Sequence, residues 1–138
     1  MRRLTAALFG LALMAGPALS DEAADASGIR QVIDAQMQAF QADDGVAAYG
    51  FASPRLQEIF PNADVFMSMV RSGYQPVYRP KSVTWGRLKE IPGGYAQEVF
   101  VVGPDGEPYV ALYALERQPD GSWRISGCQL LKSGGQSA

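Results

Sequence analysis

The sequence predicts an α+β domain in which N-terminal helices pack on a curved antiparallel sheet of four to five strands. The length of 138 residues suits a single domain. The spacing of apolar residues changes at Gly73 from about 3.6, which is typical of helices, to 2, which is typical of strands. Glycine, proline and Asp-Gly turns then separate the later segments. Helices followed by a meander of strands are an α+β layout.

The first helix is expected to begin after a Ser27 cap and to end at the Asp43-Asp44-Gly45 turn. Its apolar residues recur at helical spacing, which predicts one face turned toward a sheet. They are Ile29, Val32, Ile33, Met37 and Phe40.

Three shorter helices follow. The first spans Val46–Phe51, and the second opens at Ser53-Pro54, a hydroxyl cap followed by a proline suited to the first helical turn. Asn62 is expected to cap the last one, which Gly73 ends. Of the four predicted helices, the first and the fourth carry apolar stripes, so we expect both to cover the sheet.

The C-terminal half is expected to be extended. Pro76 and Pro80 disfavour helix at the residues before them, which predicts an extended segment over Tyr74–Arg79. Alternating apolar residues then predict four strands. They span Val83–Ile91, Tyr95–Val102, Tyr109–Arg117 and Ser122–Leu131. Both faces of the Tyr109–Arg117 strand are apolar, so the sequence leaves open which face is buried and favours a dimer through the sheet.

The N-terminus has the three parts of a secretory signal peptide. Met1-Arg2-Arg3 is positively charged, Leu4–Ala15 is apolar, and Ala18-Leu19-Ser20 places small residues before a cleavage site. Cleavage after Ser20 predicts a periplasmic or secreted protein with no membrane span after processing. We expect a flexible leader over residues 21–27, a domain over residues 28–131 and a disordered tail over residues 132–138.

Composition excludes several classes of function. The formal net charge of −2 disfavours nucleic acid as a partner. Histidine is absent, which removes the commonest general base and the usual metal ligand, so no catalytic set, metal or cofactor is predicted. The single cysteine, Cys128, lies in an apolar stretch and is expected to be buried rather than redox-active.

Aromatic side chains with polar tips are suited to lining a pocket at the open end of a curved sheet. Two arginines flank the junction after Gly73, and guanidinium groups bind carboxylates or phosphates. An anion site is one interpretation of these arginines; otherwise they cover apolar surface or pair with Glu58 and Asp64 at the surface. The candidate ligand-binding residues are Arg71, Tyr74, Tyr78, Arg79, Trp85 and Tyr113.

The chain resembles the bacterial family DUF4864. The resemblance covers about residues 28–131 and rests on a set of short motifs in a fixed order. They are Ile29-Arg30-Gln31-Val32-Ile33-Asp34-Ala35-Gln36, Ala39-Phe40-Gln41-Ala42-Asp43-Asp44, Phe51-Ala52-Ser53-Pro54, Phe66, Met69-Val70, Tyr74, Pro76-Val77, Arg79-Pro80, Trp123-Arg124-Ile125 and Gly127-Cys128. The resemblance implies a cone-shaped NTF2-like domain, a group that includes both enzymes and binding proteins.

Three functions follow from these observations. The favoured one is an exported, non-catalytic domain that binds a small apolar or anionic molecule, or a protein, through the open end of the cone. The second is a small isomerase or hydratase that pairs a tyrosine with a carboxylate, for example Tyr113 with Glu98 or Asp43. Asp43 and Asp44 are otherwise expected to form a solvated turn. The third is a dimerisation or assembly module.

Overall fold

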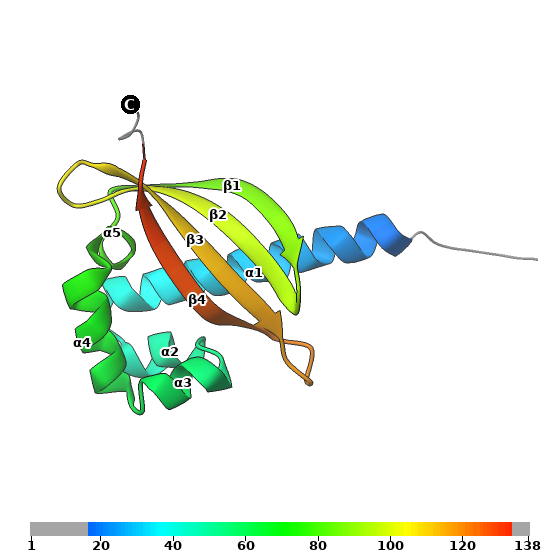
Figure 1. The fold of residues 1–138 in the computed structure, drawn as a ribbon, viewed down its shortest axis with the longest axis horizontal. Coiled ribbons are helices and arrows are strands. Elements are labelled where there is room, and N and C mark those ends of the chain that lie inside the picture. The colour runs from blue at the N-terminus through cyan, green and yellow to red at the C-terminus, as the bar shows by residue number, and fades with distance from the viewer. Residues whose placement is uncertain (1–16, 134–138) are drawn as a thin grey trace, which may run out of the picture.

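The computed structural model describes residues 17–133 and confirms the α+β architecture (Figure 1). Five helices precede one antiparallel sheet, whose strands lie in the order β1-β2-β3-β4. The helices are α1 (Pro17–Gln41), α2 (Gly45–Gly50), α3 (Pro54–Ile59), α4 (Ala63–Gly73) and α5 (Gln75–Tyr78). The strands are β1 (Ser82–Ile91), β2 (Gly94–Val102), β3 (Pro108–Arg117) and β4 (Trp123–Lys132).

Helix α1 begins earlier than predicted, so residues 21–27 are helical and are not a flexible leader. Ser27 lies inside the helix, where its hydroxyl accepts a hydrogen bond from Gln31 at 3.3 Å. Two tertiary contacts hold this part of α1 to the sheet: Asp25 pairs with Arg117, and Gly28 lies against the Trp123 ring. Alanine-rich sequence favours helix here as well.

The ends of the chain fall largely outside the description. The predicted signal peptide lies mostly within residues 1–16, which are outside the described residues, and residues 17–20 belong to the first turn of α1. Strand β4 extends to Lys132, one residue into the predicted tail, and residues 134–138 are again outside the described part.

Caps start the three short helices at the predicted positions or next to them. The side chains of Asp44, Ser53 and Asn62 accept hydrogen bonds from the backbone N–H groups of the first turns of α2, α3 and α4. Each cap contributes about 1 kcal/mol to stability. In the turn before α2, Asp43 and not Gly45 has the positive φ, at 54°. Aspartate tolerates that conformation better than most residues.

The segment after Gly73 is helical and not extended, so within residues 17–133 the sheet has four strands and no fifth. Pro76 lies in the first turn of α5, where a proline costs nothing because that turn has no intrahelical partner for its missing N–H. The backbone N–H of Arg79 closes this single turn on the carbonyl of Gln75 at 2.9 Å.

The hairpins follow the predicted turns. Gly93, Gly106 and Gly121 adopt positive φ values of 84° to 89° at the three reversals. Gly94 is needed for a different reason, because a Cβ there would lie 1.8 Å from the carbonyl oxygen of Leu115 on the neighbouring strand.

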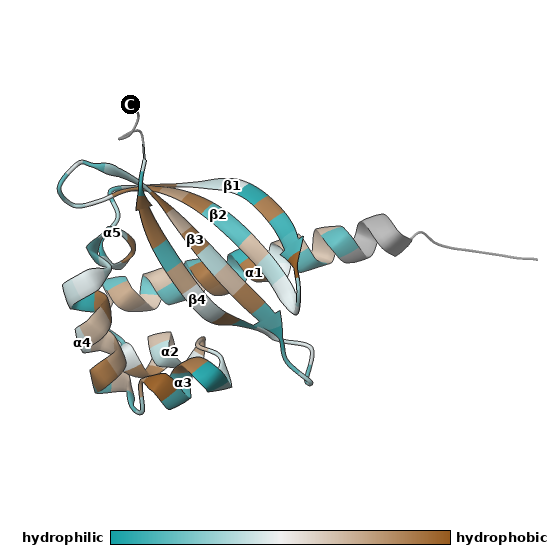
Figure 2. Cartoon of the chain, in the orientation of Figure 1, coloured by the Kyte–Doolittle hydropathy of each residue, from teal (hydrophilic) through white to brown (hydrophobic). Residues whose placement is uncertain are grey.

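Helix α1 runs behind the sheet in the view of Figure 1 and buries the concave face of the sheet. The alternation on β3 is thereby resolved: Tyr113 and its neighbours at i±2 face the core, whereas Val110, Leu112 and Ala114 face outward. Hydrophobic residues recur along these strands (Figure 2). The core consists mainly of Ile29, Ile33, Met37, Phe40, Phe66, Val70, Val99, Val101, Ala111, Tyr113, Leu115 and Ile125.

The remaining helices gather at one end of the sheet (Figure 1). In the link between α2 and α3, Ala52 forms a parallel bridge with Ile125 of β4, and the backbone N–H of Ser53 donates to the Ile125 carbonyl at 2.8 Å. Helix α4 packs mainly on α2 and α5, so it covers the sheet less directly than predicted. This arrangement leaves room between α4 and the inner face of β3 and β4.

Candidate functional site

A cavity of 260 Å³ occupies the space between the helical end of the domain and strands β3 and β4. Most of its wall is apolar, contributed by α1, α3, α4, α5 and the two strands. The lining residues are Gln36, Phe40, Leu56, Phe60, Phe66, Met69, Val70, Tyr74, Val77, Tyr113, Ile125, Gly127 and Cys128. The cavity thus joins residues that are up to 92 positions apart, and only the fold brings them together.

Tyr113 supplies the most buried polar group of this wall. Its side chain is 1% exposed, and its hydroxyl has no hydrogen-bond partner among the described residues. Cys128 is its directly opposed neighbour on β4, but the thiol does not meet hydrogen-bond geometry with the hydroxyl. A buried hydroxyl without a partner is costly, which makes this position notable.

The other polar groups of the wall are already engaged or weak. The carboxamide nitrogen of Gln36 donates to the Ala48 carbonyl at 3.1 Å, which leaves its oxygen as the acceptor of that side chain. The Tyr74 hydroxyl donates to the Cys128 carbonyl at 3.1 Å. The wall therefore offers few polar atoms at fixed positions.

None of the ionisable groups in this wall is charged near neutral pH. Burial raises the pKa of Tyr113 well above its ordinary value of 10.0. Burial also raises the pKa of the Cys128 thiol to about 12, so the cysteine stays protonated and is a poor nucleophile. Burial likewise raises the pKa of Tyr74.

The structure does not assemble either tyrosine–carboxylate pair suggested for catalysis. Glu98 lies on the opposite face of the sheet from Tyr113, where its carboxylate accepts hydrogen bonds from the Arg87 backbone and side chain. Asp43 belongs to a separate surface cluster. Across the described residues, no aspartate or glutamate lines the cavity.

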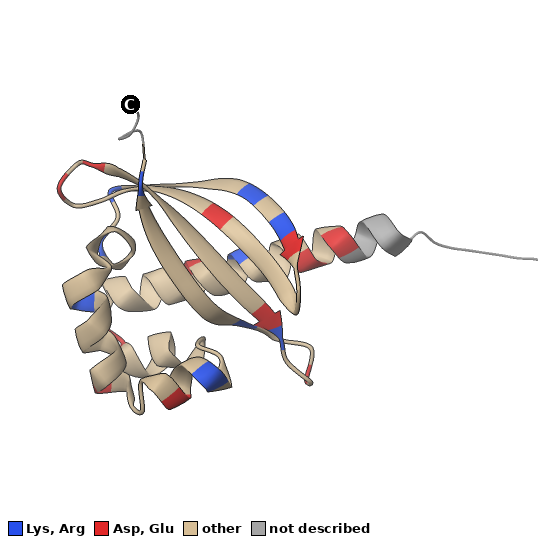
Figure 3. Cartoon of the chain, in the orientation of Figure 1, with Lys and Arg blue, Asp and Glu red and all other residues tan. Residues whose placement is uncertain are grey.

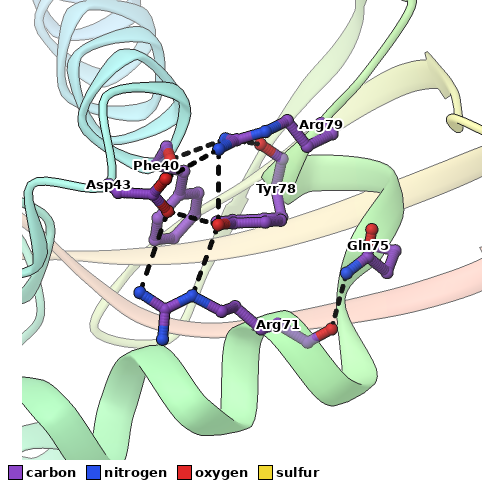
Figure 4. Close-up of polar contacts among 6 residues, drawn as sticks. All are labelled: Phe40, Asp43, Arg71, Gln75, Tyr78 and Arg79. Atoms are coloured by element: carbon purple, nitrogen blue, oxygen red, sulfur yellow. Dashed lines mark hydrogen bonds and ion pairs between the residues drawn. The ribbon is translucent and has the colours of Figure 1, made fainter.

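The two candidate arginines do come together, around the carboxylate of Asp43 in the same chain (Figure 4). Arg79 contacts Asp43 with an Nη2–Oδ2 distance of 3.0 Å, and Arg71 lies farther from it, at 3.7 Å. The Tyr78 hydroxyl donates to Asp43 and accepts from both guanidinium groups at 3.3 Å. A second Arg79 nitrogen donates to the Phe40 carbonyl at 2.7 Å, at the C-terminal end of α1.

The anion that the arginines bind is therefore Asp43. The alternative prediction named the wrong partners, Glu58 and Asp64. Asp43 is half-exposed, as are both arginines. The cluster fastens α4 and α5 to the end of α1. The expectation of a simple solvated turn holds only for Asp44, which caps α2.

Trp85 lies apart from the other candidates. It sits on β1 at the edge of the sheet, with the Arg30 guanidinium of α1 5.7 Å from its ring centre. It lines an open depression between α1 and β1 that does not include Tyr74 or Tyr113. The six predicted residues thus divide among a cavity, a surface cluster and a distant edge.

Sequence reasoning missed Gln36, and it considered Asp43 as a catalytic carboxylate or a turn residue but not as the partner of the two arginines. Gln36 is a polar residue on the buried stripe of α1 and is 3% exposed, and that break in the apolar pattern was the available signal. Asp43 gave no such signal, because its arginine partners are 28 and 36 residues away in sequence.

Among residues 17–133, no group of three or more Cys, Asp or Glu residues is placed to hold a metal ion. The helices of this described range also lack a segment long and apolar enough to cross a membrane.

The Asp43 cluster generates a test of stability against pH. The Tyr78 hydrogen bond, followed by Arg79 and Arg71, lowers the pKa of Asp43 below its ordinary value of 3.8. A lowered folded-state pKa stabilises the fold above the unfolded-state pKa, and that contribution is lost as the pH falls through the folded-state value. We expect Asp43→Asn to lower the free energy of unfolding above about pH 4, and the difference from wild type to shrink toward about pH 2.

Urea unfolding at a series of pH values measures this difference. Asp44→Asn is the matched control, because asparagine also caps a helix and Asp44 does not pair with these arginines. If the difference in free energy of unfolding between the wild type and Asp43→Asn stays constant across the acid range, the charge of Asp43 does not stabilise the fold.

Comparisons with known proteins place the chain in a family. The family model described as "Domain of unknown function (DUF4864)" matches residues 22–138. The chain is also similar to the crystal structure of an NTF-2 like protein of unknown function from Burkholderia xenovorans LB400, with 16% identity over 83% of this chain and 89% of that chain and a TM-score of 0.48. The search of curated proteins found no match. Because the family model covers nearly the whole domain, the chain belongs to the DUF4864 family, as its motifs predicted.

Proposed function

We propose that this protein is an exported NTF2-like domain that binds a small molecule in the cavity between its helices and strands β3 and β4. The observation that carries the proposal is the cavity itself, with 260 Å³ of space, an apolar and aromatic wall, and a few polar atoms. Small-molecule sites in proteins typically combine these features.

Packing energetics support an occupant. Protein interiors are close-packed, and the apolar side chains that line this cavity make fewer dispersion contacts than they would against a bound molecule. The wall includes flexible Met69 and several phenylalanines, side chains that could fill the space if nothing else used it. A bound molecule would restore the missing contacts.

Binding is favoured over proton transfer by the chemistry of the wall. An isomerase or hydratase of the type considered from the sequence needs a carboxylate beside a phenol in a dry site. In the described part of the chain, the phenol of Tyr113 has a thiol and an amide beside it on neighbouring strands, supplied by Cys128 and Gln97.

Filling the cavity tests the binding proposal. Val70 of α4 lines the cavity, so Val70→Phe should occupy part of the space and abolish the thermal stabilisation that small aromatic compounds give the wild type. The readout is the shift in unfolding temperature across a set of neutral and anionic aromatic compounds.

Val65→Phe is the matched control, because Val65 is on the same helix but is 42% exposed and outside the cavity wall. It should bind like the wild type and change stability by less than about 0.5 kcal/mol. Val70→Phe binding as well as the wild type would contradict the proposal. A stability loss of about 3 kcal/mol or more in that variant would show that the space is not free.

Export is the second part of the proposal. The positively charged Met1-Arg2-Arg3, the apolar Leu4–Ala15 and the small residues before Asp21 support it, and the family match begins at residue 22. Expressed in a bacterial host, the full chain should be recovered from the periplasm with Asp21 as its N-terminus.

N-terminal sequencing and fractionation provide the readout. Ala18→Arg places a large charged residue at the −3 position and should block processing. An unprocessed wild-type chain that remains in the cytoplasm would contradict export.

Dimerisation through the sheet is a second candidate function, favoured by one observation. On the outer face, Phe100, Val110 and Leu131 are directly opposed on three adjacent strands, and Phe100 and Leu131 are 41% and 44% exposed. Gly86 leaves space for the Phe100 ring, since a Cβ there would lie 2.6 Å from it. Charges on β3 and β4 lie near the strand ends (Figure 3), which leaves this row uncharged.

A self-complementary apolar patch of this kind suits a two-fold dimer. Light scattering should give twice the monomer mass for the wild type and for Val46→Glu, a control at an exposed position of α2, and the monomer mass for Phe100→Glu. A wild type that stays monomeric at high concentration would exclude this candidate.

A further inference from the structure

We infer that the molecule bound in the cavity is neutral and carries an acceptor to which the Tyr113 hydroxyl donates a hydrogen bond. The inference rests on the proposed function, since it presupposes that the cavity holds a ligand. It goes further by naming the chemical class and the residue that selects it.

The first argument is the hydroxyl of Tyr113. The side chain lines the cavity and is 1% exposed, and its hydroxyl has no partner among the described residues. Phenylalanine would give the same apolar packing without this cost. A tyrosine is advantageous here if an occupant supplies the missing acceptor, such as a carbonyl oxygen.

The second argument compares the two tyrosines of the wall. The Tyr74 hydroxyl is already bound to the carbonyl oxygen of Cys128 at 3.1 Å. The Tyr113 hydroxyl is buried and has no such partner among the described residues, so the two tyrosines share a side chain but differ in whether its hydroxyl is already hydrogen-bonded.

The third argument is the absence of charge. Within the described residues, no lysine, arginine, aspartate or glutamate lines the cavity. The candidate arginines Arg71 and Arg79 instead contact Asp43 outside it. An ionised ligand would lose its hydration here without gaining a counter-charge, which is strongly unfavourable. Of the apolar and anionic ligands that the sequence suggested, the cavity therefore suits the neutral one.

The volume bounds the size of the ligand. An apolar protein cavity of about 150 Å³ accepts benzene. The 260 Å³ available here has room for an aromatic or alicyclic ring with substituents, packed against Phe40, Phe60 and Phe66.

Three test compounds of nearly the same shape separate these properties. Acetophenone has a carbonyl acceptor, α-methylstyrene replaces that oxygen with a CH₂ group, and benzoate carries a negative charge. NMR titration of the ¹⁵N-labelled chain gives the dissociation constant of each compound for the wild type, Tyr113→Phe and Tyr74→Phe.

The quantity to compare is the affinity ratio of acetophenone to α-methylstyrene. One neutral hydrogen bond predicts that the ratio falls about threefold to tenfold in Tyr113→Phe and stays at the wild-type value in Tyr74→Phe. Benzoate should bind more weakly than acetophenone in all three proteins. Tyr113→Phe is expected to fold, because it removes only an unpartnered hydroxyl.

The outcomes are distinguishable. A ratio unchanged by Tyr113→Phe, or benzoate binding as tightly as acetophenone, overturns this inference and leaves the proposed function standing. Failure of all three compounds to bind the wild type overturns the inference together with small-molecule binding in the cavity.

Discussion

The packing of helix α1 across the concave face of the sheet is the constraint on which the rest of the structure depends. Its buried stripe, from Ile29 to Phe40, forms one hydrophobic core with the inward-facing residues of β2, β3 and β4. One straight helix cannot cover the whole of a curved sheet, so α2–α5 close the remaining end. Because α4 packs mainly on α2 and α5, the surface between it and the strands stays unfilled.

The position of charge follows from the same arrangement. The turn after α1 brings Asp43 to the helical end of the domain, where Arg71, Tyr78 and Arg79 surround it. A half-exposed position lets these charges keep part of their hydration, so the pairing needs no dry site. The cavity wall beside them stays neutral.

The inner and outer faces of β3 carry the same kinds of residue but have different surroundings. Tyr113 faces the cavity, whereas Val110 and Leu112 face outward with no covering element among the described residues. Both faces are apolar in sequence, and alternation alone could not distinguish them. The contact with α1 makes one of them the core, and the other remains available to a second molecule.

Local chemistry in the sequence determined the order of the elements and most of their ends. Ser53 and Asn62 begin helices because a side-chain oxygen can meet a free backbone N–H a few residues away, and the glycines of the hairpins permit positive φ. The sequence analysis missed the start of α1 and the helical turn of α5. Each is held by a contact between distant segments: Gly28 lies against the Trp123 ring, and the Arg79 side chain donates to the Phe40 carbonyl. The site was decided in the same way. Nothing near Tyr113 in sequence marks its hydroxyl as unpartnered, and nothing near Asp43 announces its arginines, since both properties arise only when strands and helices far apart in the chain are folded together.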